Sequence, residues 1–277
     1  MIEIHPSAIV DPKAELHDGV KIGAHTIVSE GAVIGAYTTI ATGALITGAA
    51  RIGERCRIAH GAVIGTDPQD LKFKNEPTIA QIGNDCVIRE YVTVNRGTIA
   101  HGITTIGNNC MLMAYVHVAH DCIVGNNVIL ANCVNMAGHT EIGDFVNIGG
   151  LVPIHQFVRI GSHCFIGGGY RVPKDVPPYV LAIGDPMRYS NLNVVGLRRR
   201  GFDTKTLRLL HQLYRILYRS GLNITQGLER AKQEIPETPE TKMVFDFYAS
   251  TKRGVIGGGR RSSGGSHERL NDDDEFK

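Results

Sequence analysis

Aliphatic residues recur at every sixth position along most of the chain. Between Ile22 and Val172, 23 of the 26 positions at this interval hold Ile, Val, Leu or Met, and the exceptions are Asp70, Glu76 and Ala100. A period of six matches neither the 3.6-residue α-helix nor the helix-pair repeats of roughly 30 residues and more. The pattern therefore predicts a solenoid in which each hexapeptide forms one short strand and one turn.

Two further positions of the hexapeptide are restricted in type. Position 5 is small or β-branched at Ala32, Ala44, Ala62, Val116, Val128 and Val146. Position 2 is repeatedly glycine, at Gly23, Gly35, Gly53, Gly65, Gly83, Gly107, Gly125, Gly143 and Gly161. We expect positions 1 and 5 to point inward, and the glycines to relieve the backbone at the turns. The repeat resembles the left-handed parallel β-helix, which implies three hexapeptides per coil and a left-handed sense.

Two segments interrupt the repeat and are predicted to be loops, at about 66–81 and 97–105. Long loops that leave a regular scaffold often carry function. We assign the β-helix, with both loops, to residues 1–185.

Beyond this solenoid, the spacing of apolar residues becomes helical. Three helices are expected from this spacing and its capping residues, one from Asp203 or Thr204 to Gly221, one over 225–234, and one from Thr238 and Pro239 to about Gly254. We therefore predict a small C-terminal helical domain at 186–256. The remaining segment, 257–277, is rich in Gly, Ser and Asp and is predicted to be a disordered tail.

Composition and charge narrow the classes of function. The chain has 33 glycines in 277 residues, with 20% charged and 6% aromatic residues, which argues against a helical bundle and against overall disorder. Its formal net charge of +2 provides no global field toward nucleic acid or a membrane surface. No apolar run of about 18 residues occurs, so we expect a cytoplasmic protein without a transmembrane segment.

The cysteines follow the repeat. Five of the six fall on the inward position 5, namely Cys56, Cys86, Cys110, Cys122 and Cys164, and Cys133 lies one place earlier in its hexapeptide. We expect reduced thiols in the core rather than disulfides or a metal cluster.

Six of the twelve histidines lie between residues 101 and 163. Hexapeptides that begin 18 residues apart stack on one wall, so His120, His139 and His155 should lie outside it in adjacent coils about 4.8 Å apart. Such a cluster suits a histidine general base, or a zinc ion held by three imidazoles. Gly138 favours the general base, because a glycine N–H can closely approach a developing oxyanion.

Several motifs around these histidines resemble one enzyme family. They are His117-Val118-Ala119-His120-Asp121-Cys122, Ala137-Gly138-His139, His155-Gln156-Phe157, Asp175-Val176-Pro177-Pro178-Tyr179 and Arg199-Arg200-Gly201-Phe202. This series is similar to the UDP-N-acetylglucosamine O-acyltransferases over residues 1 to about 256. The resemblance implies a homotrimer with active sites between subunits. It also implies transfer of an (R)-3-hydroxyacyl group from acyl carrier protein to the glucosamine 3-position of UDP-N-acetylglucosamine, the first step of lipid A biosynthesis.

The resemblance implies roles for individual residues. His120 would be the general base, Asp121 would orient it, and the Gly138 N–H would stabilise the oxyanion. Substrate would be bound by Gln69, Asp70, Lys72, His117, His139, His155, Gln156, Asn193 and Arg199. The acyl chain would lie against Phe165 and Gly168, and the carrier protein against Arg198, Arg199 and Arg200. The acyl group arrives on the carrier protein's phosphopantetheine, so no metal or separate cofactor is implied.

Two departures from the family pattern leave the sugar's 3-substituent open between hydroxyl and amino. Val195 stands where the family often has glutamate, and Asn95 stands where some members have histidine. Three other functions are compatible with the solenoid: the pathway's later N-acyltransferase, a zinc hydratase of the γ-carbonic anhydrase kind, and a non-catalytic scaffold. The N-acyltransferase usually carries a uridine-binding domain before its repeats, whereas these repeats begin by about residue 10.

Overall fold

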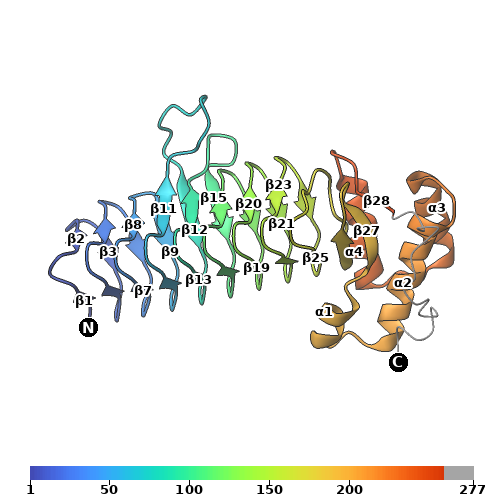
Figure 1. Ribbon diagram of the computed structural model, residues 1–277, viewed down its shortest axis with the longest axis horizontal. Helices are drawn as coiled ribbons and strands as arrows, with labels where there is room; N and C mark the ends of the chain where they lie inside the picture. The colour runs from blue at the N-terminus through green and yellow to red at the C-terminus, as the bar shows by residue number, and fades with distance from the viewer. Residues whose placement is uncertain (259–277) are drawn as a thin grey trace.

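The computed structural model describes residues 1–258 and has the form of a long three-walled β-helix with helices at its C-terminal end (Figure 1). Each wall is a sheet built from every third strand of the solenoid. In the regular coils, parallel partners are 18 residues apart, as Ile4 and Ile22 are. The prediction of a left-handed parallel β-helix of hexapeptides with a small helical C-terminal part is confirmed.

We name the three sheets wall A, wall B and wall C. Wall A contains β1 (Glu3–Ile4), β4 (Lys21–Ile22), β7 (Thr39–Ile40), β10 (Arg57–Ile58), β13 (Val87–Ile88), β16 (Met111–Leu112), β19 (Ile129–Leu130), β22 (Asn147–Ile148), β25 (Phe165–Ile166), β26 (Val180–Ile183), β27 (Arg188–Leu192) and β28 (Gly257–Gly258). Wall B contains β2 (Ile9–Val10), β5 (Ile27–Val28), β8 (Leu45–Ile46), β11 (Val63–Thr66), β14 (Thr93–Asn95), β17 (His117–Val118), β20 (Asn135–Met136) and β23 (Pro153–Ile154). Wall C contains β3 (Glu15–Leu16), β6 (Val33–Ile34), β9 (Ala50–Ile52), β12 (Ile79–Ile82), β15 (Ile103–Ile106), β18 (Ile123–Val124), β21 (Glu141–Ile142) and β24 (Arg159–Ile160).

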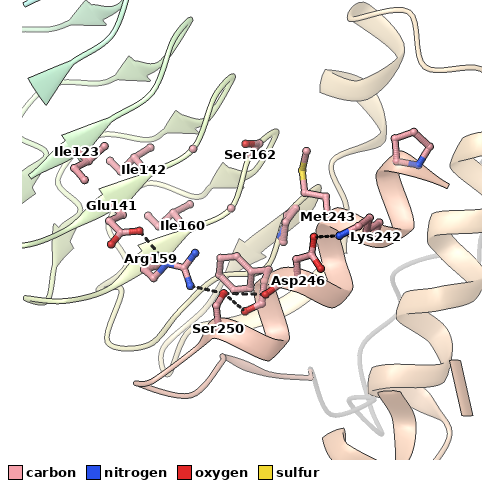
Figure 2. A pocket seen from close by; sticks show the side chains of 15 residues that line it. Ile123, Glu141, Ile142, Arg159, Ile160, Ser162, Lys242, Met243, Asp246 and Ser250 are labelled. Atoms are coloured by element: carbon pink, nitrogen blue, oxygen red, sulfur yellow. Dashed lines mark hydrogen bonds and ion pairs between the residues drawn. The ribbon is translucent and has the colours of Figure 1, made fainter. Parts of the chain in front are cut away.

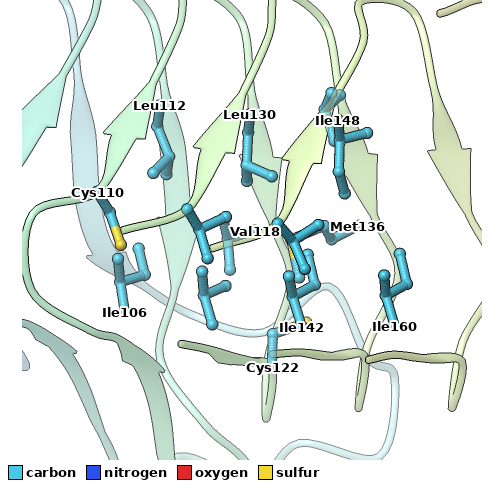
Figure 3. Close-up of a cluster of buried hydrophobic side chains, with 14 of the residues drawn as sticks. Ile106, Cys110, Leu112, Val118, Cys122, Leu130, Met136, Ile142, Ile148 and Ile160 are labelled. Carbon is cyan, nitrogen blue, oxygen red and sulfur yellow. The ribbon is translucent and has the colours of Figure 1, made fainter. Parts of the chain in front are cut away.

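The sixfold aliphatic pattern becomes the core. All 23 aliphatic residues at this interval are buried, and Figure 3 shows Val118 and Met136 among those that fill the interior. The five cysteines at position 5 are buried free thiols, whereas Cys133, one place earlier in its hexapeptide, is an exposed free thiol. Each buried aliphatic side chain contributes about 1.5–3 kcal/mol, so the column supplies the main stabilisation of the solenoid.

The predicted role of the position 2 glycines in the turns is wrong for all of them except Gly65. In most hexapeptides the residue with positive φ is the fourth, and it is often not glycine, as at Asp121 (57°) and His139 (59°). Among the named position 2 glycines, only Gly65 has positive φ, at 86°. Glycine is needed at position 2 because adjacent coils approach too closely for a side chain. A Cβ added to Gly35 would lie 2.5 Å from the carbonyl carbon of Gly53 in the next coil.

Both predicted loops leave the solenoid at the corner between walls B and C. They span 67–78 and 96–102, because β12 begins at Ile79 and β15 begins at Ile103, a few residues before the predicted returns. Figure 1 shows them projecting from the same edge of the solenoid. The two loops are bonded to each other there, because the Thr78 hydroxyl donates a hydrogen bond to the Gly97 carbonyl.

The C-terminal part begins with a hairpin that the apolar spacing does not reveal. Its strands, β26 and β27, extend wall A and pair antiparallel. The helices that follow are α1 (Val194–Arg199), α2 (Thr204–Arg219), α3 (Ile224–Glu234) and α4 (Pro239–Ser250). Asp203 and Thr238 are the N-caps of α2 and α4 as predicted, whereas α4 ends before Gly254 and α1 was not predicted.

Only two residues of the predicted tail lie within the described part of the chain. They form β28, which pairs with β27, so the tail prediction is wrong for Gly257 and Gly258. Residues 259–277 lie outside the described residues. Among residues 1–258, none of the helices has the length and apolar character needed to cross a bilayer.

The close approach of the coils gives a stability prediction. Gly35→Ala should lower the free energy of unfolding by about 2 kcal/mol or more, because the new methyl group overlaps backbone atoms that cannot move independently. Gly227→Ala in α3 is the matched control, since the nearest atom to its new Cβ is 3.4 Å away. The control should be neutral or stabilising, by about 0.5–1 kcal/mol. Thermal melting of both variants checks the prediction, and an equal effect would contradict it.

Candidate active site

The corner between walls B and C gathers most of the histidines that the sequence singled out. His120 lies in the turn from β17 to β18, and His139 lies in the turn from β20 to β21, one coil further on. The His139 N–H donates to the His120 carbonyl at 3.1 Å, and the two ring centroids are 5.1 Å apart. The two side chains are neighbours in adjacent coils, as predicted, and their rings meet edge to face.

His120 and Asp121 form a hydrogen-bonded pair. The His120 Nδ1 lies 2.8 Å from Oδ2 of Asp121, whose side chain is fully buried while that of His120 is 13% exposed. Burial alone would raise the pKa of Asp121, but hydrogen bonds from Thr98 and His120 hold that pKa below its ordinary value. With Asp121 ionised, Nδ1 is the donor and Nε2 keeps its lone pair. The pair is therefore arranged for Nε2 to accept a proton.

His139 is held by rings on several sides. It stacks on Phe157 with centroids 4.5 Å apart and meets His101 edge to face at 5.5 Å. Burial, with the neighbouring imidazoles, lowers the pKa of His139 despite the opposing effect of Asp121. A neutral imidazole is thus favoured at this position, where it can offer a hydrogen bond to a bound ligand.

His117 projects from wall B beside the same corner. Its Nδ1 lies 2.7 Å from the hydroxyl of Thr93 in the coil below. Burial, with a smaller contribution from His120, lowers the pKa of His117. His117 and His139 therefore favour the neutral form on either side of His120.

Gly138 packs directly against the His120 ring. A Cβ at this position would lie 2.6 Å from Cε1 and 2.7 Å from Nε2 of His120. Among the described residues, no acceptor is within hydrogen-bonding geometry of the Gly138 N–H. His155 and Gln156 are exposed one coil further along the same corner. The glycine thus leaves both Nε2 and a backbone donor accessible at one place.

The first loop brings a carboxylate toward this cluster. Asp70 makes a small contribution that raises the pKa of His139, against the stronger effect of burial, which lowers it. The loop is anchored by Arg96, which bonds Asp67 at 2.8 Å and lies over the Phe73 ring at 4.8 Å. Gln69 and Lys72 are exposed on the same loop.

A second group of predicted residues lies at a different corner, between walls C and A. Asn193 caps α1 through Gly196 and donates to the carbonyl of His163, which lies in the turn from β24 to β25. Both polar groups of the Asn193 side chain are thus used within the fold. A single chain does not bring this corner together with His120.

The three consecutive arginines, Arg198 to Arg200, differ in how exposed they are. Arg198 and Arg199 are exposed, whereas Arg200 is half-buried with its guanidinium over the Phe145 ring at 5.4 Å. Burial lowers the pKa of Arg200. The exposed cationic surface therefore comprises Arg198 and Arg199 rather than all three residues.

The two residues implied in acyl-chain binding lie on and beside wall A. Phe165 is 38% exposed on the outer face of β25. Gly168 follows at the next corner, and a Cβ there would lie 3.1 Å from the carbonyl oxygen of Gly150. This surface is separate, within one chain, from the corner that carries His120.

Two adjoining cavities lie along wall C. One, of about 730 Å³, is lined by His101, His139, Glu141, Phe157, Arg159, Asp175, Ser250, Lys252 and Arg253. The other, of about 660 Å³, lies beneath α4 and shares Glu141, Arg159 and Ser250 with the first (Figure 2). Arg159 bonds Glu141 at 3.0 Å and Ser250 at 2.9 Å, so it joins the solenoid to α4 between them.

The same cluster has the side chains of a metal site. Ligand atoms of His120, Asp121 and His139 lie within 4.8 Å of one another. Both oxygens of Asp121 already accept hydrogen bonds, from Thr98 and His120. A zinc ion bound through Nδ1 of His120 would have to replace the bond to Asp121, so the donor set fits a hydrogen-bonded pair better than a metal centre.

Comparison with known proteins assigns the family. A model described as UDP-N-acetylglucosamine O-acyltransferase, domain 2, matches residues 175–256, and a bacterial transferase hexapeptide model matches residues 103–138. A protein of Thermodesulfovibrio yellowstonii named acyl-(acyl-carrier-protein)–UDP-N-acetylglucosamine O-acyltransferase is 45% identical, over 92% of this chain and 99% of its own length. This chain belongs to the UDP-N-acetylglucosamine O-acyltransferase family.

Solved structures of this acyltransferase family agree with the assignment. The chain matches a UDP-N-acetylglucosamine acyltransferase of Bacteroides fragilis with a TM-score of 0.89 and 43% identity, over 91% of this chain and 99% of the other. It matches that of Campylobacter jejuni with a TM-score of 0.87 and 40% identity, over 93% and 100%. The prediction of an acyltransferase of this family is therefore confirmed.

Four residues that contact this cluster or line its cavities were not predicted as site residues. Thr98 bonds Asp121, His101 and Phe157 contact His139, and Arg159 lines both cavities. Phe157 and His139 both occupy position 4 of their hexapeptides, in adjacent coils of the same corner. The repeat register could therefore have predicted that Phe157 lies beside His139. Thr98 and His101 lie in a loop without register, and nothing in the repeat points to them.

The corner between walls C and A gives a pH prediction. His163 stacks between Phe145 and Tyr179, and burial, with Arg200, lowers its pKa to about 4. Its unfolded pKa is about 6.5, so stability is full above that pH and is lost as the pH falls toward 4. His163→Phe should therefore reduce the fall in melting temperature between pH 7.5 and pH 5. Phenylalanine already occupies the equivalent turn position at Phe145, so an unchanged pH dependence would count against the assignment.

Proposed function

We propose that this protein transfers an (R)-3-hydroxyacyl group from acyl carrier protein to the glucosamine 3-position of UDP-N-acetylglucosamine, the first step of lipid A biosynthesis. The observation that carries the proposal is His120, bonded through Nδ1 to the buried Asp121 and facing Gly138 through Nε2. Membership of the acyltransferase family supports the same reaction.

In the proposed reaction, Nε2 of His120 takes the proton of the sugar hydroxyl while its oxygen attacks the thioester carbonyl. The carbonyl oxygen becomes an oxyanion, which the Gly138 N–H is placed to stabilise. The carbon–sulfur bond then breaks, and the imidazolium returns its proton to the departing thiolate. Asp121 stabilises the imidazolium between these steps through its bond to Nδ1.

We propose that substrate is held by residues of both corners. Gln69, Asp70, Lys72, His117, His139, His155 and Gln156 would contact the sugar nucleotide from the corner of His120. Asn193 and Arg199 would contribute from the other corner. The exposed Arg198 and Arg199 would face the acidic carrier protein, and Phe165 and Gly168 would lie along the acyl chain. Local cations can steer an acidic partner although the net charge of the chain is only +2.

We propose that the protein is a homotrimer, and the separation of the two corners supports a site shared between subunits. If Arg199 acts with His120, the two residues must come from different chains, and cyclic symmetry then repeats the combined site at each interface. We also propose a cytoplasmic location, which the free thiols of all six cysteines support.

The experiment that tests the function is an acyl-transfer assay with purified protein. UDP-N-acetylglucosamine and its 3-amino analogue are each offered with 3-hydroxyacyl carrier proteins of several chain lengths, with a metal chelator present. We expect turnover without added cofactor, because the acyl group is delivered on phosphopantetheine. No turnover, together with zinc in the preparation, would favour the hydratase.

His120→Gln should lower kcat by about 100- to 10,000-fold, because glutamine cannot accept the proton. The variant should stay folded, because His120 lies in a turn outside the aliphatic core and a glutamine amide can still donate a hydrogen bond to Asp121. His17→Gln, at an exposed site near the N-terminus, is the matched control and should retain full activity. A kcat for His120→Gln close to that of the control would refute the general-base role.

Mixed oligomers test whether each site combines two chains. His120→Gln and Arg199→Ala should each be inactive. If each site combines the two residues from neighbouring chains, every mixed trimer keeps one intact site of its three, so the isolated mixed trimers should have about a third of the wild-type activity. Complementary affinity tags isolate the mixed species. Mixed oligomers as inactive as the parents would show that both residues act within one chain.

A further inference from the structure

Loop 96–102 folds back onto the buried carboxylate of the catalytic pair. The Thr98 N–H donates to Oδ1 of Asp121 at 2.9 Å, and the Thr98 hydroxyl donates to Oδ2 at 2.7 Å. Thr98 is 7% exposed and Asp121 is fully buried, so water does not compete for these bonds. One residue thus contacts both oxygens of the carboxylate that holds His120.

The loop is itself fixed in place. The Gly102 N–H donates to the Thr98 carbonyl at 2.7 Å, which closes the loop. The Gly97 N–H donates to the Ile79 carbonyl at 3.1 Å, and the Gly97 carbonyl accepts a hydrogen bond from the Thr78 hydroxyl at 2.6 Å. Thr98 is therefore presented to Asp121 by a rigid segment rather than by a chance contact.

Thr98 also fixes the orientation in which the Asp121 carboxylate faces His120. Oδ2 of Asp121 accepts from both the Thr98 hydroxyl and the His120 Nδ1. A buried carboxylate that loses a donor becomes easier to protonate and freer to rotate, because burial disfavours its charge. Either change would weaken its hold on Nδ1.

We propose that Thr98 is a positioning residue of the acyl transfer: through both oxygens of Asp121, it keeps the carboxylate ionised and directed at His120. This inference rests on the proposed function of the His120 and Asp121 pair. A purely structural role, in which Thr98 only closes its loop, predicts loss of stability without a specific effect on kcat.

The test compares variants of Thr98 in the acyl-transfer assay. Thr98→Val, which keeps the shape and loses the hydroxyl, should lower kcat by about 10- to 100-fold with KM for the sugar nucleotide within about twofold. The acidic limb of the kcat profile should move to higher pH, since the pKa of Asp121 rises without the donor. Thr98→Ser, which restores the hydroxyl, should recover kcat to within about threefold of wild type.

Two controls separate positioning from folding. Thr26 is a buried threonine far from the site whose hydroxyl donates to the Ala41 carbonyl at 2.7 Å, so Thr26→Val should cost stability and leave kcat unchanged. In an Asp121→Asn background, Thr98→Val should change kcat by less than about threefold, because its effect passes through the carboxylate. Where Thr98→Val folds poorly, Thr98→Ala carries the same comparison with Thr98→Ser.

Three results would overturn the proposal. They are wild-type kcat and pH profile in Thr98→Val, failure of serine to do better than valine, and an undiminished effect in the Asp121→Asn background. Absence of turnover by the wild-type protein would instead refute the proposed reaction. In that case, carbon-13 titration of the Asp121 carboxyl, which needs no substrate, still decides whether Thr98 keeps it ionised.

Discussion

The close stacking of successive coils is the constraint on which the rest of the structure depends. Strand pairing fixes adjacent coils at about 4.8 Å, which leaves no room for a Cβ at position 2, as at Gly35. The same spacing brings position 4 side chains into contact along each corner. His139 on Phe157, and His163 on Phe145, are two products of this one geometry. The cluster of His120, Asp121 and His139 thus follows from placing these residues at a corner whose backbone is already set.

A rigid corner can hold side chains close together, but it cannot by itself solvate a buried charge. Asp121 occupies a turn that the repeat makes regardless of residue type, with φ at 57°. Its ionisation depends on donors from outside the repeat, and loop 96–102 supplies them. Loop 96–102, which interrupts the repeat, thus provides hydrogen bonds to both oxygens of this carboxylate.

The parts of the structure that follow the repeat could be predicted from the sequence, and those that leave it could not. The six-residue interval from Ile22 to Val172 predicts which residues form the core. The 18-residue interval between stacked coils predicts that His120 and His139 lie close together. The bond between Thr98 and Asp121, and the inward turn of Arg200, depend on loop and helix geometry that no period specifies. The glycines at position 2 were recognised by pattern but misread, because close approach and positive φ both favour glycine.

The walls of a solenoid are nearly flat, and a flat surface cannot enclose a substrate, whereas binding sites are generally concave. The cavities beside His139 arise where α4 and the following segment cover wall C, with Arg159 joining the two through Glu141 and Ser250. Asn193 and Arg199 lie at the corner between walls C and A. Within one chain, they therefore do not cover the corner that bears His120. A fold of this kind must therefore complete its site with added elements, of which loops, C-terminal helices and a neighbouring copy are the three that this chain can supply.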